Sequence, residues 1–217
     1  MYKHERKESK YQPTDTNSDL PILDNLPSTY YMAMSQYLSE RGLSYMTARY
    51  NGWSMCERNG RRIYIPARSQ IEDHVYWQAR GIDGQELRYD SPRGPRRDAL
   101  VVVESGYAPK VLAIVEGPMD ALAVGELPGC TGIAIMGISP SEETIYHLLT
   151  YAKRYGTIMF IADRDQLHGM FNVQTRVLFK AQLMGLDSFY GGSLITLDRK
   201  DFACYNYSER NEMLLNE

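Results

Sequence analysis

The sequence lacks the features that mark several large classes of protein. Only three cysteines occur in its 217 residues, at Cys56, Cys130 and Cys204, and an odd, widely spaced set fits neither a disulfide framework nor a paired-cysteine zinc site. No apolar run approaches the roughly 20 residues of a membrane span, and the N-terminus is charged where a secretory signal is apolar. No glycine-rich loop ends in Lys-Ser or Lys-Thr, which argues against a P-loop ATPase. We therefore expect a cytoplasmic protein that does not contact membranes.

A uniformly basic surface is also missing, because the net charge is −3. The charge is unevenly spread, since nine arginines but only five acidic residues lie between Arg58 and Arg97. Aromatic residues that can stack on unpaired bases are interleaved with these arginines: Tyr64, Tyr76, Trp77 and Tyr89. Arg62, Arg80 and Arg88 are our candidates for contacts with nucleic-acid or nucleotide phosphates. The alternative is that the arginines form an ordinary solvated face.

The chain is expected to divide into four parts. Residues 1–27 are polar and contain several prolines, which predicts a flexible tail, and residues 206–217 are expected to form a C-terminal tail. Residues 28–108 are expected to form a small basic α+β subdomain. Its predicted elements are two helices followed by three strands, at residues 31–41, 44–50, 62–66, 74–80 and 86–89.

The remaining part, residues 109–205, alternates apolar runs with helical periodicity. The predicted strands are 111–115, 132–136, 157–162 and 193–197, and the predicted helices between them are 118–126, 140–155 and 170–185. Such alternation favours an α/β fold with a doubly wound parallel sheet covered by helices on both faces. Ligands of such sheets bind beyond the carboxyl ends of the strands.

Acidic residues follow three of these predicted strands. Glu116 follows the first, Asp163 and Asp165 follow the third, and Asp201 comes after the last. Parallel strands would bring these carboxylates to one edge, where like charges repel and a divalent cation, most simply Mg²⁺, would neutralise them. Glu116 has the alternative of capping the next helix. Asp120 is a further candidate for a direct role, with pairing to a neighbouring arginine as the alternative.

Four segments of this part resemble the motifs of one domain family. Val115–Leu122 is similar to a strand ending in Glu-Gly with an Asp four residues after the Glu. Ala134–Pro140 resembles the strand and glycine that precede a capped helix, and Asp163–Asp165 matches an Asp-x-Asp motif. Asp198–Phe202 resembles a Lys-Asp-Phe stretch found near the end of phage primase domains. Together they resemble the TOPRIM domain shared by DnaG-type primases, topoisomerases and some nucleases.

Segments upstream separate primases from the other TOPRIM proteins. Tyr37–Ser44 resembles a helix motif of primases, and Arg62–Pro66 resembles their Arg-x-x-x-Pro strand. Arg80–Asp83 and Arg88–Pro92 are similar to a strand pair that ends in Lys-Tyr-x-Asn-Ser-Pro. The resemblance covers about residues 30–205 and is to the catalytic core of DnaG-type and bacteriophage primases without their zinc-binding domain.

The resemblance implies a TOPRIM sheet preceded by a smaller basic subdomain, and a nucleotidyltransferase activity. A DNA primase makes short RNA primers from NTPs on a single-stranded DNA template, with two Mg²⁺ or Mn²⁺ ions. By this resemblance Asp163, Asp165 and Asp201 would hold metal, and Glu116 would be a metal ligand or a general base. Lys200 would contact the triphosphate.

The resemblance also implies partners. A core without a zinc-binding domain is expected to work with a replicative helicase or a separate zinc-binding subunit, for which the apolar segment 20–23 is a candidate docking peptide. The likeness to phage primases implies a phage-encoded protein in the cytoplasm of the bacterial host. Two alternatives stay open: a TOPRIM nuclease that uses the same acids, and a noncatalytic replication subunit that binds single strands through the basic part.

Overall fold

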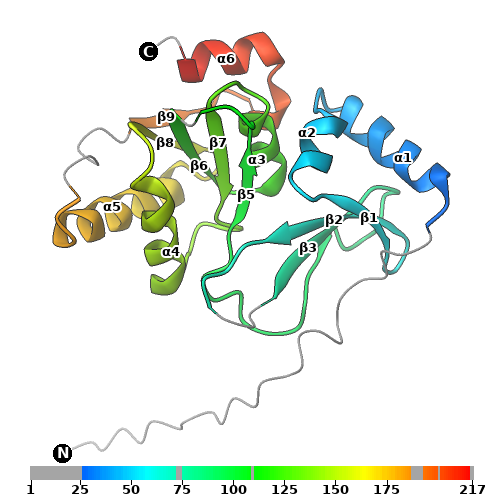
Figure 1. Cartoon of the computed structure of the whole chain (residues 1–217), viewed down its shortest axis with the longest axis horizontal. Coiled ribbons are helices and arrows are strands. Elements are labelled where there is room, and N and C mark those ends of the chain that lie inside the picture. The colour runs from blue at the N-terminus through cyan, green and yellow to red at the C-terminus, as the bar shows by residue number, and fades with distance from the viewer. Residues whose placement is uncertain (1–25, 72–74, 109, 187–192, 200, 216–217) are drawn as a thin grey trace, which may run out of the picture.

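The computed structural model describes residues 26–71, 75–108, 110–186, 193–199 and 201–215. Two β-sheets lie side by side in these residues, each with its own helices (Figure 1). Nearly all of the predicted tail at 1–27, together with Lys200, lies outside the described residues. Within the described part of the chain, no helix is long and apolar enough to cross a membrane.

The N-terminal half contains two helices and an antiparallel sheet. Its elements are α1 (Ser28–Ser39), α2 (Tyr45–Tyr50), β1 (Ser54–Glu57), β2 (Arg61–Ala67), β3 (Tyr76–Gly81) and β4 (Tyr89–Asp90), with the strand order β1-β2-β3-β4. Gly42, which follows α1, has a φ of +66°, a conformation that glycine adopts without steric cost. The Ser44 side chain then caps α2 by accepting a hydrogen bond from the Thr47 N–H. Both predicted helices are confirmed to within three residues.

Two strands of this sheet differ from the prediction. β1 is not foreseen from the sequence, and the strand predicted at 86–89 is wrong, because β4 contains only Tyr89 and Asp90. The Leu87 carbonyl instead accepts a hydrogen bond of 2.9 Å from the Arg62 guanidinium. The segment before β4 is therefore held by a buried side chain as well as by a single backbone hydrogen bond, from the Gly81 N–H to the Arg88 carbonyl at 3.0 Å.

The C-terminal half is an α/β sheet, as predicted. Its strands are β5 (Val101–Glu104), β6 (Val111–Val115), β7 (Cys130–Ala134), β8 (Thr157–Ala162) and β9 (Ser193–Thr196), in the order β5-β7-β6-β8-β9. Its helices are α3 (Pro118–Gly125), α4 (Glu142–Ala152) and α5 (Leu167–Leu183). Neighbouring strands from β7 to β9 are parallel. A Cβ atom on Gly132 of β7 would lie 2.2 Å from the Ala121 carbonyl oxygen, so only glycine lets α3 pack this closely.

One strand of this sheet departs from the parallel pattern. β5 pairs with β7 in the antiparallel sense, and it lies in this sheet although it precedes residue 109, where we place the domain boundary. The side chains of Val101, Val102 and Val103 are buried, and pairing at the edge of the sheet is how this short apolar run satisfies its backbone hydrogen bonds. The five-stranded sheet therefore includes a strand that precedes the predicted domain boundary.

The two faces of the five-stranded sheet bury different cores. Val111, Ala113 and Val115 of β6 face a core that continues into α1, α3 and β2, whereas Leu112 and Ile114 face α4 and α5. Alternation along a strand produces this division. Because the first core is continuous, the N-terminal half is packed against the α3 face as part of the same hydrophobic unit.

The C-terminal segment is not the tail that the sequence predicts. After a short 3₁₀ helix, η3 (Phe202–Cys204), residues Tyr207–Leu215 form α6. Arg210 of α6 is fully buried, lies 2.9 Å from a carboxylate oxygen of Glu126, and donates a hydrogen bond of 2.7 Å to the Gly42 carbonyl. Glu126 also accepts a hydrogen bond from the Ser44 N–H. A buried ion pair thus joins α6 to the end of α3 and to the α1–α2 turn.

The cysteines are not all buried. Cys56 and Cys130 are buried and free, as a chain without disulfides predicts, whereas Cys204 at the end of η3 is exposed.

Candidate active site

The first acidic residues lie where β6 passes into α3. β6 ends at Val115, Glu116 follows, and α3 begins at Pro118, whose fixed φ and missing N–H suit the first position of a helix. Asp120 lies in the first turn of α3 and is 6% exposed. Its Oδ1 accepts a hydrogen bond of 2.9 Å from the Ala203 N–H. This contact fastens η3, far away in the sequence, against the start of α3.

The other acidic residues follow β8 and β9. β8 ends at Ala162, the half-buried Asp163 and the exposed Asp165 follow it, and α5 begins at Leu167. Asp201 is half-buried and immediately precedes η3. The structure therefore brings all the acidic residues predicted from the sequence to the carboxyl ends of the parallel strands.

These carboxylates act on one another. The pKa of Asp163 is raised to about 8, first by burial and then by the charges of four neighbouring carboxylates: Asp120, Glu116, Asp201 and Asp165. Burial and the Asp201 charge raise the pKa of Asp120 to about 7, against the opposing effect of its backbone hydrogen bonds. Burial and the Asp165 charge raise the pKa of Glu116. We call these five residues the acidic edge.

The acidic edge fits a cation. The Oε2 atom of Glu116 is buried and has no hydrogen-bond partner among the described residues, and a buried carboxylate oxygen without a partner is costly. As they stand, no three Asp, Glu, His or Cys side chains in the described part of the chain are placed to hold one metal ion. An ion here would therefore be bound by one or two carboxylates together with water or substrate oxygens, which is how proteins usually bind Mg²⁺.

The structure does not bring all the predicted phosphate-binding residues to the acidic edge. Arg62 is 1% exposed, and its guanidinium donates to the carbonyls of Arg58, Ala79 and Leu87 at 2.7, 3.2 and 2.9 Å. Its proposed role in phosphate binding is wrong, because each of these donors is used to hold the backbone between strands. Lys200 lies outside the described residues, so the structure places no atom of this candidate.

Arg80 and Arg88 lie beside the Tyr89 ring, and Asp120 of the acidic edge also influences the pKa of this tyrosine. Arg80 is 4% exposed, donates a hydrogen bond of 2.8 Å to the Tyr37 hydroxyl, and lies 4.9 Å from the centre of the Tyr89 ring. Its Nη1 is buried and has no partner among the described residues. Burial raises the pKa of Tyr89, the charges of Arg80 and Arg88 lower it, and the Asp120 carboxylate raises it. Arg80 of β3 and Arg88, just before β4, therefore bring positive charge next to the acidic edge.

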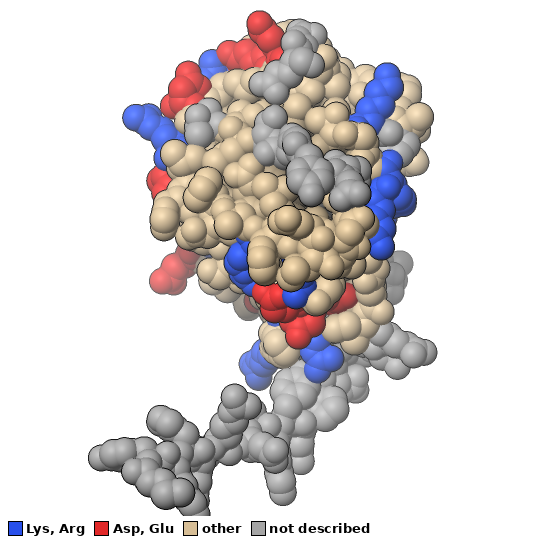
Figure 2. All heavy atoms as spheres, turned by 90° about the vertical axis from the view of Figure 1, so that its left-hand side faces the viewer, with Lys and Arg blue, Asp and Glu red and all other residues tan. Residues whose placement is uncertain are grey.

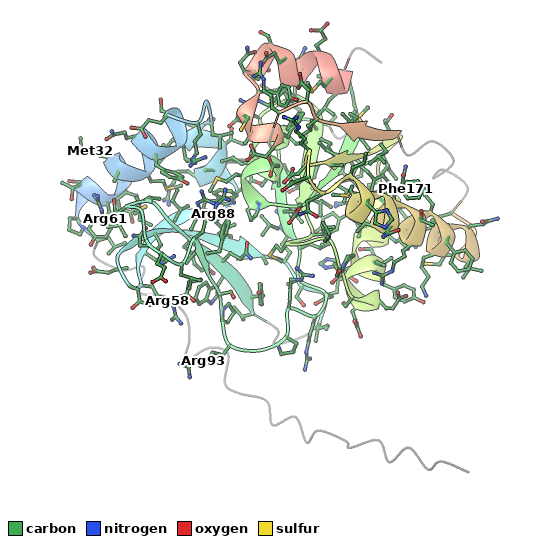
Figure 3. All side chains as sticks on the ribbon, turned by 180° about the vertical axis from the view of Figure 1, so that it is seen from behind. Met32, Arg58, Arg61, Arg88, Arg93 and Phe171 are labelled. Carbon is green, nitrogen blue, oxygen red and sulfur yellow. The ribbon has the colours of Figure 1, made fainter. Side chains whose placement is uncertain are left out.

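Arg88 is the exposed member of this pair. Its guanidinium lies 6.0 Å from the centre of the Tyr89 ring, and its side chain is open to solvent. Figure 3 labels it with Arg58, Arg61 and Arg93, which all lie on the N-terminal half. Of the three arginines predicted to contact phosphates, Arg88 is the one whose side chain is exposed and can meet a ligand without rearrangement.

Arg96 was not among the candidates selected from the sequence, but the structure connects it to the five-stranded sheet. Arg96 donates a hydrogen bond to the Met136 carbonyl, in the loop that follows β7, and burial lowers its pKa. Met136 has a φ of +54°, an uncommon conformation for a residue other than glycine. The charge-rich stretch 93–97 was the only feature of the sequence that could have pointed to Arg96. Its connection to the loop after β7 depends on the tertiary fold.

Comparisons with known proteins establish the fold. No protein-family model matches the sequence, and no curated protein matches it either. Among solved structures, a DnaG catalytic core matches with a TM-score of 0.60 at 16% identity, over 88% of this chain and 78% of that one. A DnaG primase catalytic domain bound to single-stranded DNA matches with a TM-score of 0.61 at 16% identity, over 88% and 76% of the two chains. The E. coli primase catalytic core matches with a TM-score of 0.58 at 16% identity, over 85% of this chain and 74% of that one.

The chain therefore has the fold of a DnaG primase catalytic core. This confirms the predicted fold class, a mostly parallel α/β sheet preceded by a smaller part with its own sheet.

Proposed function

We propose that this protein is the catalytic core of a DNA primase, which synthesises short RNA primers from NTPs on single-stranded DNA. The observation that carries the proposal is the acidic edge, five mutually repelling carboxylates at the carboxyl ends of the strands of a DnaG-like sheet. Arg80 of β3 and Arg88, just before β4, lie next to it. One structure with the same fold is of a primase domain bound to single-stranded DNA, which supports the choice of template.

The reaction joins two nucleotides. The 3′-hydroxyl oxygen of one attacks the α-phosphorus of the next, the bond from that phosphorus to the bridging oxygen breaks, and pyrophosphate leaves. Asp163, Asp165, Asp201 and Glu116 are the residues that would hold Mg²⁺ or Mn²⁺. When bound, the ions would offset the negative charge of the triphosphate and of the reacting oxygens.

The protein side chains have distinct tasks in this proposal. Glu116 has a pKa raised by burial, which makes its carboxylate a better acceptor for the proton of the attacking hydroxyl. Arg88, and Arg80 through its unpartnered Nη1, would bind phosphates of the template or the incoming nucleotide. Asp120 holds η3 in place through Ala203 and so positions Asp201.

A partner completes the proposal. A replicative helicase or a separate zinc-binding subunit would bring the template to this core and raise its local concentration by tethering. Segment 20–23, which lies outside the described residues, is the proposed docking peptide. We also propose that the protein works in the cytoplasm of a bacterial cell as a phage-encoded enzyme.

One assay separates the three candidate functions. Purified protein is incubated with single-stranded DNA, labelled NTPs and Mg²⁺ or Mn²⁺, and the products are resolved for both synthesis and degradation. Asp163→Asn with Asp165→Asn is the test variant, and Glu212→Gln, which removes an exposed acid of α6, is the matched control. Labelled RNA made by the wild type and by Glu212→Gln only would support the primase. Shortened DNA without RNA would indicate a nuclease, and binding without any reaction would indicate a noncatalytic subunit.

A further inference from the structure

A cleft of about 540 Å³ lies between the end of β2 and the C-terminal end of α4. Arg68 and Gln70, which follow β2, line one wall, and His147, Tyr151 and Arg154 line the other. All the described residues that line this cleft carry a polar group on their side chains, and none of them is acidic. The volume falls in the range of small-molecule sites. We call this feature the α4 cleft.

The α4 cleft lies at the opposite edge of the five-stranded sheet from the acidic edge. Arg154 comes three residues before the first residue of β8, whereas Asp163 directly follows β8. The six residues of β8 span about 20 Å. On the other wall, Arg68 pairs with Glu104, which is aligned with Thr131 near the amino end of β7. A ligand in the α4 cleft is therefore separate from the acidic edge.

A buried carboxylate outside the acidic edge holds the two walls together. Asp98 is 3% exposed, and its two carboxylate oxygens accept hydrogen bonds from the Ser69 hydroxyl at 2.5 Å and from the Gln70 N–H at 2.6 Å. The Nδ1 atom of His147, which is equally buried, lies 2.7 Å from the Asp98 carbonyl oxygen. The Gln70 side chain donates a hydrogen bond of 2.9 Å to the Thr150 hydroxyl. The charge of Asp98 is therefore used inside the protein, and both walls are fixed before a ligand arrives.

Two arginines in the α4 cleft interact with the same tyrosine. The Arg154 guanidinium lies 4.8 Å from the centre of the Tyr151 ring, and it forms no ion pair with any residue that the structure describes. Burial lowers the pKa of Arg68, but its interactions with Tyr151 and Glu104 outweigh this effect and raise it. The distance from Arg68 to the Glu104 carboxylate is 3.1 Å. A carboxylate thus neutralises the charge of Arg68, whereas the charge of Arg154 is left for a ligand.

These groups suit the binding of phosphate. A guanidinium binds phosphate oxygens through parallel N–H donors, and amide and hydroxyl side chains such as those of Gln70 and Thr150 add neutral donors. On the side of the molecule that α4 and α5 form, lysines and arginines are scattered among acidic residues and make no continuous basic surface (Figure 2). Affinity for a small anion would therefore depend on the cleft and not on a general positive field.

We propose that the α4 cleft binds a small phosphate-bearing anion, such as pyrophosphate or the phosphate chain of a nucleotide. Arg154 supplies the free positive charge, and Arg68 supplies further N–H donors from the opposite wall. The proposal is independent of the proposed function, because the cleft shares no residue with the acidic edge or with the arginines next to it.

The first test follows the ring signals of the histidines by nuclear magnetic resonance. His147 lies in the cleft, whereas His168 lies in the first turn of α5, three residues after Asp165. The full chain with isotope-labelled histidine is titrated with pyrophosphate in a metal chelator, so that the acidic edge stays free of cations and repels the anion. The signals are assigned by replacing His4, His74 and His168 with glutamine, one at a time.

We expect a saturable shift of the His147 signal and no shift of the His168 signal. A His147 signal that stays in place up to about 10 mM pyrophosphate would overturn the proposal. Equal shifts of both signals would also overturn it, because they would mean that the anion binds without preference for the cleft.

The second test uses variants of exposed residues, so that the fold is preserved. Arg154→Gln should weaken pyrophosphate binding by at least about 10-fold. Lys153→Gln is the matched control, because Lys153 is the exposed neighbour of Arg154 and does not line the cleft; it should change the affinity by less than about twofold. Arg68→Gln combined with Glu104→Gln removes the second arginine without leaving its partner unpaired, and it should also weaken binding. Equal losses in Arg154→Gln and Lys153→Gln would overturn the proposal.

A comparison of ligands identifies the source of the phosphates. Tripolyphosphate and ATP are titrated under the same conditions, with the His147 signal as the readout. Equal affinities would show that the cleft binds the phosphate chain alone, and tighter binding of ATP would show that it also contacts the nucleoside. Failure of both to move the His147 signal would overturn the proposal.

Discussion

The acidic edge and the arginines of the four-stranded sheet carry opposite charges, and the fold treats them in opposite ways. Arg58 and Arg61 pair with Asp90 and Asp83, and Arg62 is enclosed by backbone carbonyls. The carboxylates of the acidic edge instead act on one another, and burial together with their charges raises the pKa of Asp163 to about 8. Charges that are neutralised by the protein itself stabilise the fold, whereas charges left in mutual repulsion require something from outside the protein. The acids are therefore the stronger sign of function.

The largest expected effect tests the acids. Replacing Asp163 and Asp165 together by asparagine should lower primer synthesis by at least about 100-fold, because catalysis of this kind depends on charge placed at the reacting phosphate. Circular dichroism should show an intact fold. Primer synthesis at the wild-type rate by this variant would show that Asp163 and Asp165 take no part in the mechanism.

A second prediction tests whether buried and exposed arginines differ as the structure indicates. Arg62→Met should lower the free energy of unfolding by about 3 kcal/mol, because it leaves buried carbonyls without donors, while Arg88→Met should change it by less than about 0.5 kcal/mol. Urea denaturation of the two variants measures both values. Equal losses of unfolding free energy in the two variants would mean that Arg62 does not stabilise the fold more than Arg88 does.

A third prediction follows from the raised pKa values. Asp163 and Asp120 have pKa values of about 8 and about 7 in the folded protein, against 3.8 for an ordinary aspartate. Between about pH 4 and pH 8 the folded state therefore binds more protons than the unfolded state, so stability should fall as pH rises through this window.

The measurement is the melting temperature from pH 4.5 to 8.5 in a metal chelator. Asp163→Asn should flatten the decline and melt at a higher temperature than the wild type at pH 8, whereas the control Glu212→Gln should follow the wild type. Parallel curves for wild type and Asp163→Asn would show that repulsion at the acidic edge does not destabilise the fold. Added Mg²⁺ should recover part of the loss in the wild type only.

The smallest expected effect concerns Arg88. Arg88→Gln should reduce the salt dependence of single-strand binding by about 0.7 in the logarithmic slope, the value for one phosphate contact on a single strand. Fluorescence anisotropy over a range of salt concentrations measures this slope. Arg61→Gln is a suitable control, because Arg61 is already paired with Asp83; a drop of the same size in both variants would indicate a general charge effect.

Much of the fold was predictable because it depends on local patterns. The apolar runs at 111–115 and 157–162 match β6 and β8 residue for residue, since their short length and their β-branched residues favour a buried strand over a buried helix. β1 was missed and β4 was misplaced because short strands have weak patterns and are determined by their partners. The helix α6 was missed because its buried Arg210 looks like a surface residue until Glu126 is placed beside it.

The sequence by itself determined the order of the strands and helices along the second half, and therefore that acids at three distant positions reach one edge. Strand direction and side-chain alternation are local properties, so the sequence was sufficient for that conclusion. Only the tertiary structure decided which charges are neutralised inside the protein. Arg62 and Arg88 are the same residue type in the sequence, and only their surroundings in the fold differ. Backbone carbonyls of three separate segments accept hydrogen bonds from Arg62, whereas Arg88 is exposed to solvent.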